Sequence, residues 1–237
     1  MPDNSYFFPQ VMQRYAINPN PASGYFRAQA PLDEINKEFI ASLLRSFEES
    51  TFNATEFEPY SLELIVDYIQ RTHAFYLQKK LPEIEQSISL LSTLYTSDHP
   101  ILVALRSFFH RYCQDLTEHI ADEEKNLLPY IVLLRQAADS PKHFSEYIFA
   151  CRSYSISKFL SGHHDTEDEL RGIRQTIRLY EPPATNESLY RILLAQLQSF
   201  EQDLQVHAHI EEEVLIPKAQ KLETELNGRL QQHLPLN

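Results

Sequence analysis

The pattern His-x3-Glu-x5-Pro occurs twice in this chain, starting at His119 and at His207, with the same spacing in both copies. On an α-helix, residues i and i+4 lie on one face about one turn apart, so each histidine is next to its glutamate, Glu123 or Glu211. Imidazole and carboxylate are ligands of divalent first-row metals such as iron, zinc and manganese. Two copies in register predict a duplicated helical hairpin that carries a metal centre.

The composition favours a helical protein. The chain has only four glycines in 237 residues, and its long stretches rich in Leu, Ile, Glu and Gln are typical of helices. Hydrophobic periodicity and prolines predict four long helices. They span roughly 61–95, 98–138, 142–180 and 185–226. Short connections make consecutive helices antiparallel neighbours, so we expect an all-α fold, an up-down four-helix bundle over residues 61–230.

Residues 1–60 form an N-terminal extension in this interpretation. Residues 1–30 are rich in Pro, Asn and aromatic side chains, which predicts an arm on the surface of the main body or a partly disordered segment. Residues 32–49 have the periodicity of a short amphipathic helix. No chemical motif is evident in the extension.

Charge and cysteine content narrow the function classes. A net charge of −12 disfavours nucleic acid and anionic membranes as partners. The two cysteines, Cys113 and Cys151, are too few for a disulfide framework or an iron–sulfur site, and we expect reduced thiols on helices. No run of 18 apolar residues and no signal-peptide pattern is evident, so we expect a soluble, cytoplasmic protein.

Helical phase separates ligand candidates from surface residues on the second and fourth helices. A metal in a bundle core needs ligands on the inward, apolar face. On the fourth helix His207 and Glu211 follow the apolar stripe, whereas His209 points to the opposite side. On the second helix Glu123 lies near the middle of the stripe and His119 near its edge.

The first and third helices each offer one more histidine. His73 is the single histidine of the first helix and aligns with its apolar stripe. On the third helix, phase favours His163 over the adjacent His164, which points away. His73 precedes His119 by nearly the same distance as His163 precedes His207, which agrees with a duplicated hairpin.

The predicted ligand set is too large for one tetrahedral zinc ion. It comprises His73, His119, Glu123, His163, His207 and Glu211. Four imidazoles and two carboxylates fit two metals bridged by the carboxylates, which matches two iron ions best and leaves manganese or zinc open. Core histidines are often simply hydrogen-bonded, and i,i+4 His–Glu pairs are often on the surface. Two buried glutamates without a metal would, however, leave costly unpaired charge.

With these motifs the chain resembles a known family. Residues about 61–226 are similar to the hemerythrin-like di-iron domain of the repair-of-iron-centres family. The resemblance rests on His73 before Leu81-Pro82-Glu83, His119-x3-Glu123-Glu124 before Leu127-Leu128-Pro129, His207-x3-Glu211 before Pro217, and a third-helix histidine about twenty residues before Pro182-Pro183. It implies a non-haem di-iron site, oxo- or hydroxo-bridged, in which the four histidines are terminal ligands and the two glutamates bridge the irons.

The resemblance also implies a function. The family is associated with restoring iron–sulfur clusters damaged by nitric oxide or peroxide, so we expect a stress-response protein that binds diatomic or peroxide ligands and meets damaged iron–sulfur proteins. Family members usually carry an N-terminal cysteine motif, whereas this chain has no cysteine before Cys113. A reductase of nitric oxide, oxygen or peroxide, a sensor of such ligands, and a metal-free interaction module remain alternatives. Whether the chain is an enzyme stays open.

Overall fold

The computed structural model describes residues 7–16, 36–48, 51–94, 100–162 and 187–233, and every regular element within these ranges is helical. Three long helices dominate, and each consists of two α-helical parts joined by one π-helical turn. They are α3 (Leu62–Phe75), η3 (Tyr76–Lys80) and α4 (Leu81–Leu94); α5 (Pro100–Asp122), η4 (Glu123–Leu127) and α6 (Leu128–Asp139); and α10 (Glu187–Ile210), η6 (Glu211–Leu215) and α11 (Ile216–His233). The all-α prediction is confirmed.

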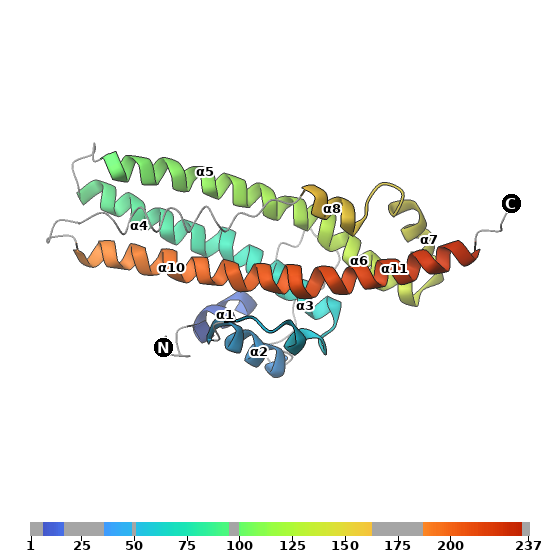
Figure 1. Ribbon diagram of the computed structural model, residues 1–237. Helices are drawn as coiled ribbons and strands as arrows, with labels where there is room; N and C mark the ends of the chain where they lie inside the picture. Colours follow the sequence, from blue (N-terminus) through green and yellow to red (C-terminus); the bar gives the residue numbers. More distant parts are fainter. Residues whose placement is uncertain (1–6, 17–35, 49–50, 95–99, 163–186, 234–237) are drawn as a thin grey trace.

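The long helices pack lengthwise as a helical bundle (Figure 1). The helix α3–α4 runs antiparallel to both neighbours, since α4 lies against α5 and α10 while α3 lies against α6 and η6. Ser61 starts α3 as its N-cap, accepting a hydrogen bond from the Leu64 N–H at 3.3 Å. The last helix continues to His233, beyond the end predicted near residue 226.

The third segment differs from the single helix predicted over 142–180. Helices α7 (Pro141–Ala150) and α8 (Ile156–Gly162) are separated by a turn over residues 151–155. Ser155 explains the new start, because its hydroxyl accepts the N–H of Lys158 at 3.2 Å as an N-cap does. Residues 163–186, with His163, His164 and Pro182-Pro183, lie outside the described part of the chain.

The described part of the N-terminal extension contains one helix more than predicted. The short helix is confirmed as α2 (Lys37–Glu48), but residues 7–16 form a further helix, α1, instead of an irregular arm. Both helices lie beside α3 and α10, near the middle of the bundle (Figure 1). One face of α1 is buried against the bundle.

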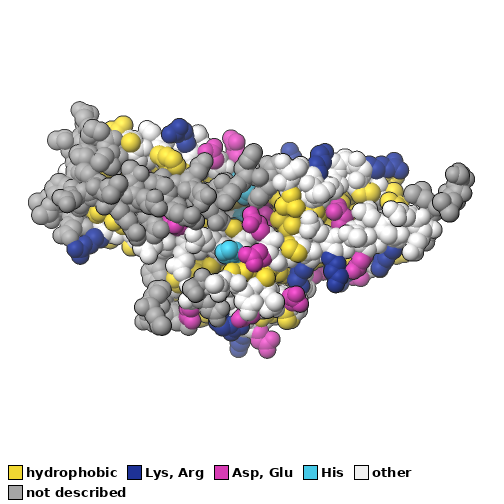
Figure 2. All heavy atoms as spheres, viewed as in Figure 1, with side chains coloured by type: hydrophobic (Ala, Val, Ile, Leu, Met, Phe, Trp, Pro, Cys, Tyr) yellow, Lys and Arg dark blue, Asp and Glu magenta, His cyan; other side chains and the backbone are white. Residues whose placement is uncertain are grey.

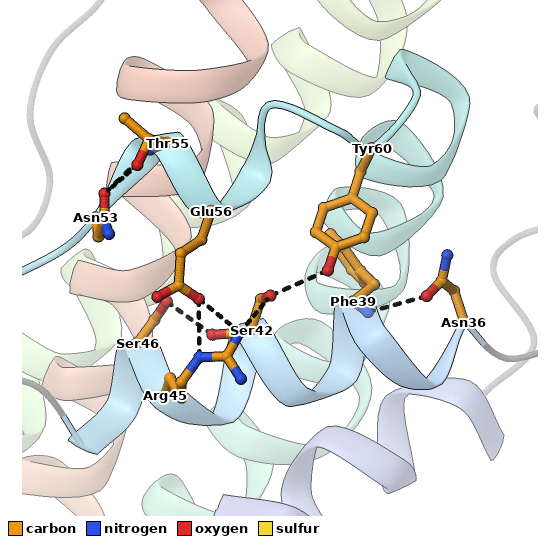
Figure 3. A network of polar contacts seen from close by, with 9 residues as sticks. All are labelled: Asn36, Phe39, Ser42, Arg45, Ser46, Asn53, Thr55, Glu56 and Tyr60. Carbon is orange, nitrogen blue, oxygen red and sulfur yellow. Dashed lines mark hydrogen bonds and ion pairs between the residues drawn. The ribbon is translucent and has the colours of Figure 1, made fainter.

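Polar contacts hold α2 to the chain that follows it (Figure 3). The Asn36 side chain caps α2 by accepting the Phe39 N–H at 3.0 Å. Arg45 donates to Glu56 of the 3-10 helix η2 (Ala54–Phe57) at 2.8 Å, and the hydroxyls of Ser42 and Tyr60 are 3.0 Å apart. These contacts fix the path from the extension into α3.

The hydrophobic core is divided into two clusters along the bundle. One contains α1, α2, the start of α3, and residues of η4, α6–α8, η6 and α11; the other contains η3, α4, α5 and most of α10. On the long helices the division falls between Ile69 and Phe75, between Ile120 and Leu127, and between Leu204 and Val206. A polar layer occupies this level.

No helix within the described residues has the length and apolar character needed to cross a bilayer.

Candidate metal centre

The repeated proline explains where the long helices widen. The backbone N–H groups of Leu81, Leu128 and Ile216 donate to carbonyls five residues back, those of Tyr76, Glu123 and Glu211. Each donor is followed by proline, which has no N–H and whose ring clashes with the carbonyl four residues back in a regular α-helix. A π turn accommodates this by one extra residue, and such turns are frequent at functional sites. Two of them begin at predicted ligands.

Three predicted ligands from three different helices meet in the polar layer. Potential donor atoms of His73, Glu123 and His207 all lie within 4.8 Å of one another, and all three side chains are buried. The ring centroids of His73 and His207 are 5.1 Å apart. The fold therefore brings together residues up to 134 positions apart, since 207 − 73 = 134.

Glu123 is at the centre of this group. Its Oε2 is 3.0 Å from Nε2 of His73, and its Oε1 is 2.7 Å from Nε2 of His119. Neither oxygen accepts a well-directed hydrogen bond, although the side chain is only 1% exposed. Each carboxylate oxygen thus faces a different imidazole nitrogen without the angle of a hydrogen bond. Such a geometry is expected if the carboxylate oxygens and the imidazole nitrogens bind the same cations and not one another.

The histidine of the second repeat is more deeply buried than His119, but its pairing with the glutamate is less close. Nε2 of His207 is 3.7 Å from Oε2 of Glu211, and both residues are buried. Glu211 Oε1 and His207 Nδ1 have no hydrogen-bond partner. Buried polar atoms normally find partners, so these orphaned atoms indicate that the group is incomplete without an ion or water.

A further carboxylate orients His73. Glu124 Oε1 is 2.8 Å from Nδ1 of His73, and Gln70 donates to the other Glu124 oxygen at 3.0 Å. In the neutral form of His73, donation of Nδ1–H to Glu124 would leave the Nε2 lone pair directed to the centre of the group. A carboxylate behind the imidazole is the usual arrangement around a metal-bound histidine.

The charges of the group depend on one another. Burial opposes protonation of His73, but Glu123 and Glu124 raise its pKa to about 10. Burial disfavours the charged form of Glu123, yet His119 and His73 bring its pKa well below the usual range. Burial and the Glu123 charge raise the pKa of Glu211, whereas burial and the His73 charge lower that of His207. Without metal, therefore, His73 and Glu211 are protonated, and these protons offset part of the carboxylate charge that bound cations would otherwise offset.

The other histidines follow the predicted phase where they are described. His209 is outside the group: its ring stacks on Phe52 at 5.1 Å, and its Nδ1 is 2.8 Å from Glu213. His110 is exposed, with Gln114 at 3.3 Å. His119 lies at the edge of the layer, with a side chain 20% exposed. The structure thus brings His73, His119, Glu123, His207 and Glu211 together, whereas His163 lies outside the described residues. Figure 2 shows histidine and acidic side chains side by side on one face near the middle of the bundle.

Two polar residues beside the group were not predicted. Asp203 is fully buried one turn before His207 and accepts a hydrogen bond from the Tyr76 hydroxyl at 3.1 Å. The ring of Tyr76 is 5.8 Å from that of His207. An i,i+4 spacing from Asp203 to His207 was a signal in the sequence, because it continues the inward face of the second repeat by one turn.

A bundle with an internal layer of histidines and glutamates, between two apolar clusters, defines a candidate metal-binding helical protein. Residues 76–219, more than half of the chain, match the model of the hemerythrin HHE cation binding domain. The chain belongs to this family. It is also similar to the iron-sulfur cluster repair protein ScdA of Staphylococcus haemolyticus (strain JCSC1435), with 22% identity over 191 residues, which are 81% of this chain and 78% of that protein. The predicted family resemblance is confirmed.

Proposed function

We propose that this protein holds a non-haem di-iron centre in the polar layer of its bundle. His73, His119, His163 and His207 would be terminal ligands, and Glu123 and Glu211 would bridge the two irons. The observation that supports this assignment most is Glu123, whose two oxygens face two different histidines at 3.0 and 2.7 Å. A buried carboxylate used on both sides in this way is what a bridging ligand requires.

The residues fit iron by number and type. The orphaned atoms of His73, Glu123, His207 and Glu211 are nitrogen and oxygen donors in a buried site, and imidazole with carboxylate suits iron, with manganese or zinc as competitors. Two carboxylates would offset part of the charge of two divalent ions, which an apolar interior could not do. The cysteines are free thiols on other parts of the bundle and supply no donor to this group.

The chain's own residues prepare the site for the metal. Glu124 fixes the His73 tautomer, and the two apolar clusters limit water access from either end of the bundle. When bound, a carboxylate-bridged iron pair supplies exchangeable positions for a diatomic molecule or peroxide and a change of oxidation state. Protons leave His73 and Glu211 as the ions enter, since ligating groups must be deprotonated.

We infer a role in nitrosative or oxidative stress, in which the protein assists repair of damaged iron–sulfur proteins in the cytoplasm. The similarity to an iron-sulfur cluster repair protein supports this role. A centre made only of imidazole and carboxylate, without thiolate, holds iron less firmly against thiol-rich acceptors. Iron transfer to an apo iron–sulfur protein is therefore the activity to measure first.

The test of the metal centre uses a matched pair of variants on one helix. The protein is prepared anaerobically, loaded with Fe(II), desalted and assayed for iron and for its ultraviolet–visible spectrum after oxidation. We expect close to two irons per wild-type chain, and a large loss in His207→Ala. His209→Ala is the control, because His209 is two residues away on the outer face and pairs with Glu213 in the same i,i+4 spacing. Equal iron in both variants, or one zinc per wild-type chain, would contradict the proposal.

The same preparation separates repair from the alternative functions. Stoichiometric transfer of iron to an apo iron–sulfur protein supports donation. Many turnovers of nitric oxide, oxygen or peroxide with an electron donor would identify a reductase instead. A ligand-dependent change in hydrogen exchange of α1 and α2, without transfer or turnover, would identify a sensor.

A further inference from the structure

The N-terminal helix α1 places a charged side chain deep in the protein. Arg14 is completely buried, in the same face of α1 as Phe7, Gln10 and Val11. Its guanidinium is 5.4 and 5.3 Å from the ring centroids of Tyr68 and Phe75, and Nη1 donates to the Tyr68 hydroxyl at 2.6 Å. A fully buried arginine is rare unless it is paired, so its partner identifies what the helix serves.

That partner is Asp203, which forms a salt bridge with Nη2 of Arg14 and is itself completely buried. Asp203 lies one turn before His207 on α10, so both side chains share one face of the helix. The same oxygen, Oδ1, also accepts the Tyr76 hydroxyl at 3.1 Å. Arg14 and Tyr76 therefore fix the Asp203 carboxylate from two different helices.

Tyr76 completes the path to the centre. It lies three residues after His73, at the first position of the π turn, and its ring meets that of His207 edge-on at 5.8 Å. The chain of contacts runs from Arg14 to Asp203, to Tyr76 and to His207. One end is in the N-terminal extension, and the other is a predicted metal ligand.

We propose that Arg14 is a positioning residue for the metal centre, which acts through Asp203 and Tyr76 to hold His207 in place. The N-terminal helix is then a component of the centre, and this inference rests on the proposed metal-binding function. Arg14 has a second effect in this arrangement. It offsets the charge of Asp203, which lies on the same helical face as His207 and Glu211. An unpaired Asp203 carboxylate would compete with these residues for a cation.

The purely structural alternative is a buried ion pair that only stabilises the fold. Removing one partner of such a pair strongly destabilises a protein, whatever lies nearby. A positioning role predicts more: the metal should leave faster and its spectrum should change, because the geometry and donor set around His207 change. Substitutions that affect the surroundings of metal ligands commonly alter metal affinity by about 10- to 100-fold.

The experiment compares Arg14→Met, Arg14→Lys and the double variant Arg14→Met/Asp203→Asn with wild type. The double variant removes both charges but keeps an oxygen that can accept the Tyr76 hydroxyl. Arg45→Met is the control, since Arg45 forms an ion pair with Glu56 in the same extension with a side chain 48% exposed. Each protein is loaded with Fe(II), and three properties are measured: release of iron to a chelator, the spectrum after oxidation, and thermal unfolding with and without metal.

We expect Arg14→Met to release iron about tenfold faster or more and to alter the spectrum, with partial rescue in Arg14→Lys and in the double variant. Arg45→Met should match wild type. The inference is overturned if Arg14→Met lowers the melting temperature of both forms equally while release and spectrum stay unchanged. Should Arg14→Met not fold, Tyr76→Phe decides, because it removes only the hydrogen bond to Asp203; unchanged release then refutes the proposal. A wild-type protein without metal would instead refute the proposed function itself.

Discussion

Replacing Glu123 by glutamine tests the centre most directly. The change keeps the size of the side chain but removes its charge and converts one carboxylate oxygen into an amide nitrogen, which is a poor metal ligand. Glu123 faces His73 at 3.0 Å and His119 at 2.7 Å, so its two oxygens are both in use. We therefore expect Glu123→Gln to weaken binding of both metals.

The expected loss of metal affinity follows from the two contacts between the Glu123 carboxylate and the metal ions, which the substitution weakens. An interaction with a charged group contributes about 1.5–3 kcal/mol, so two of them correspond to roughly 3–6 kcal/mol, or on the order of 10²- to 10⁴-fold in metal affinity. Glu124→Gln should cost about tenfold, since Glu124 only orients His73 from behind. Glu213→Gln should change nothing, because that carboxylate pairs with His209 on the outer surface.

The assay is competition for Fe(II) between each variant and a coloured chelator under anaerobic conditions. Urea unfolding of the metal-free proteins serves as the check that each variant is folded. If Glu123→Gln retains two metals with an affinity within about threefold of wild type, the bridging role is wrong.

The remaining predictions concern protons and stability. Metal binding near pH 7 should release protons, because the pKa of His73 is raised by its carboxylate neighbours and burial raises that of Glu211. Calorimetric titrations in two buffers of different ionisation enthalpy measure the number of protons released. A value of zero would contradict this prediction. In the metal-free protein the raised pKa of His73 adds stability that is complete below about pH 6.5 and is lost as the pH rises through about 10. Urea unfolding across this range should show the loss, and the His73→Gln variant should not show this pH dependence. Tyr130→Phe should lower the free energy of unfolding by about 1.5–3 kcal/mol, because it removes a 2.6 Å hydrogen bond to the Glu223 carboxylate, whereas Tyr154→Phe should be nearly neutral because that hydroxyl has no hydrogen-bond partner. Chemical denaturation of the two tyrosine variants checks this contrast, which equal losses would refute.

The residues gathered in the polar layer were predictable where helical phase was uninterrupted. His73, His119 and His207 all precede the π turns of their helices, so a constant rotation of about 100° per residue placed them correctly. The extra residue of each π turn shifts the phase of everything after it. The glutamates lie at the first position of the turn, just before that shift, which is why their inward direction was also predicted correctly.

The N-terminal helix could not be predicted in the same way. Arg14 occupies a position of the i, i+3, i+4, i+7 pattern started by Phe7, and a charged residue there is typical of the edge of an apolar face. Its partner Asp203 is 189 residues away, and a single sequence gives no signal that joins them. The break between α7 and α8 was missed for a different reason, since the Ser155 cap is one hydroxyl within an otherwise continuous helical pattern.

The polar layer and the π turns beside it are costly for the stability of the bundle. A carbonyl displaced by a π turn and a buried glutamate at its first position both cost stability, and neither contributes to packing of the two apolar clusters. Without metal, the layer depends on protons on His73 and Glu211 to offset part of the charge of the ionised Glu123. The bundle can carry this costly layer because apolar clusters on both sides hold the helices at fixed spacing. Binding of two cations would replace the protons on His73 and Glu211 with stronger positive charge, so metal loading should stabilise the middle of the bundle more than its ends.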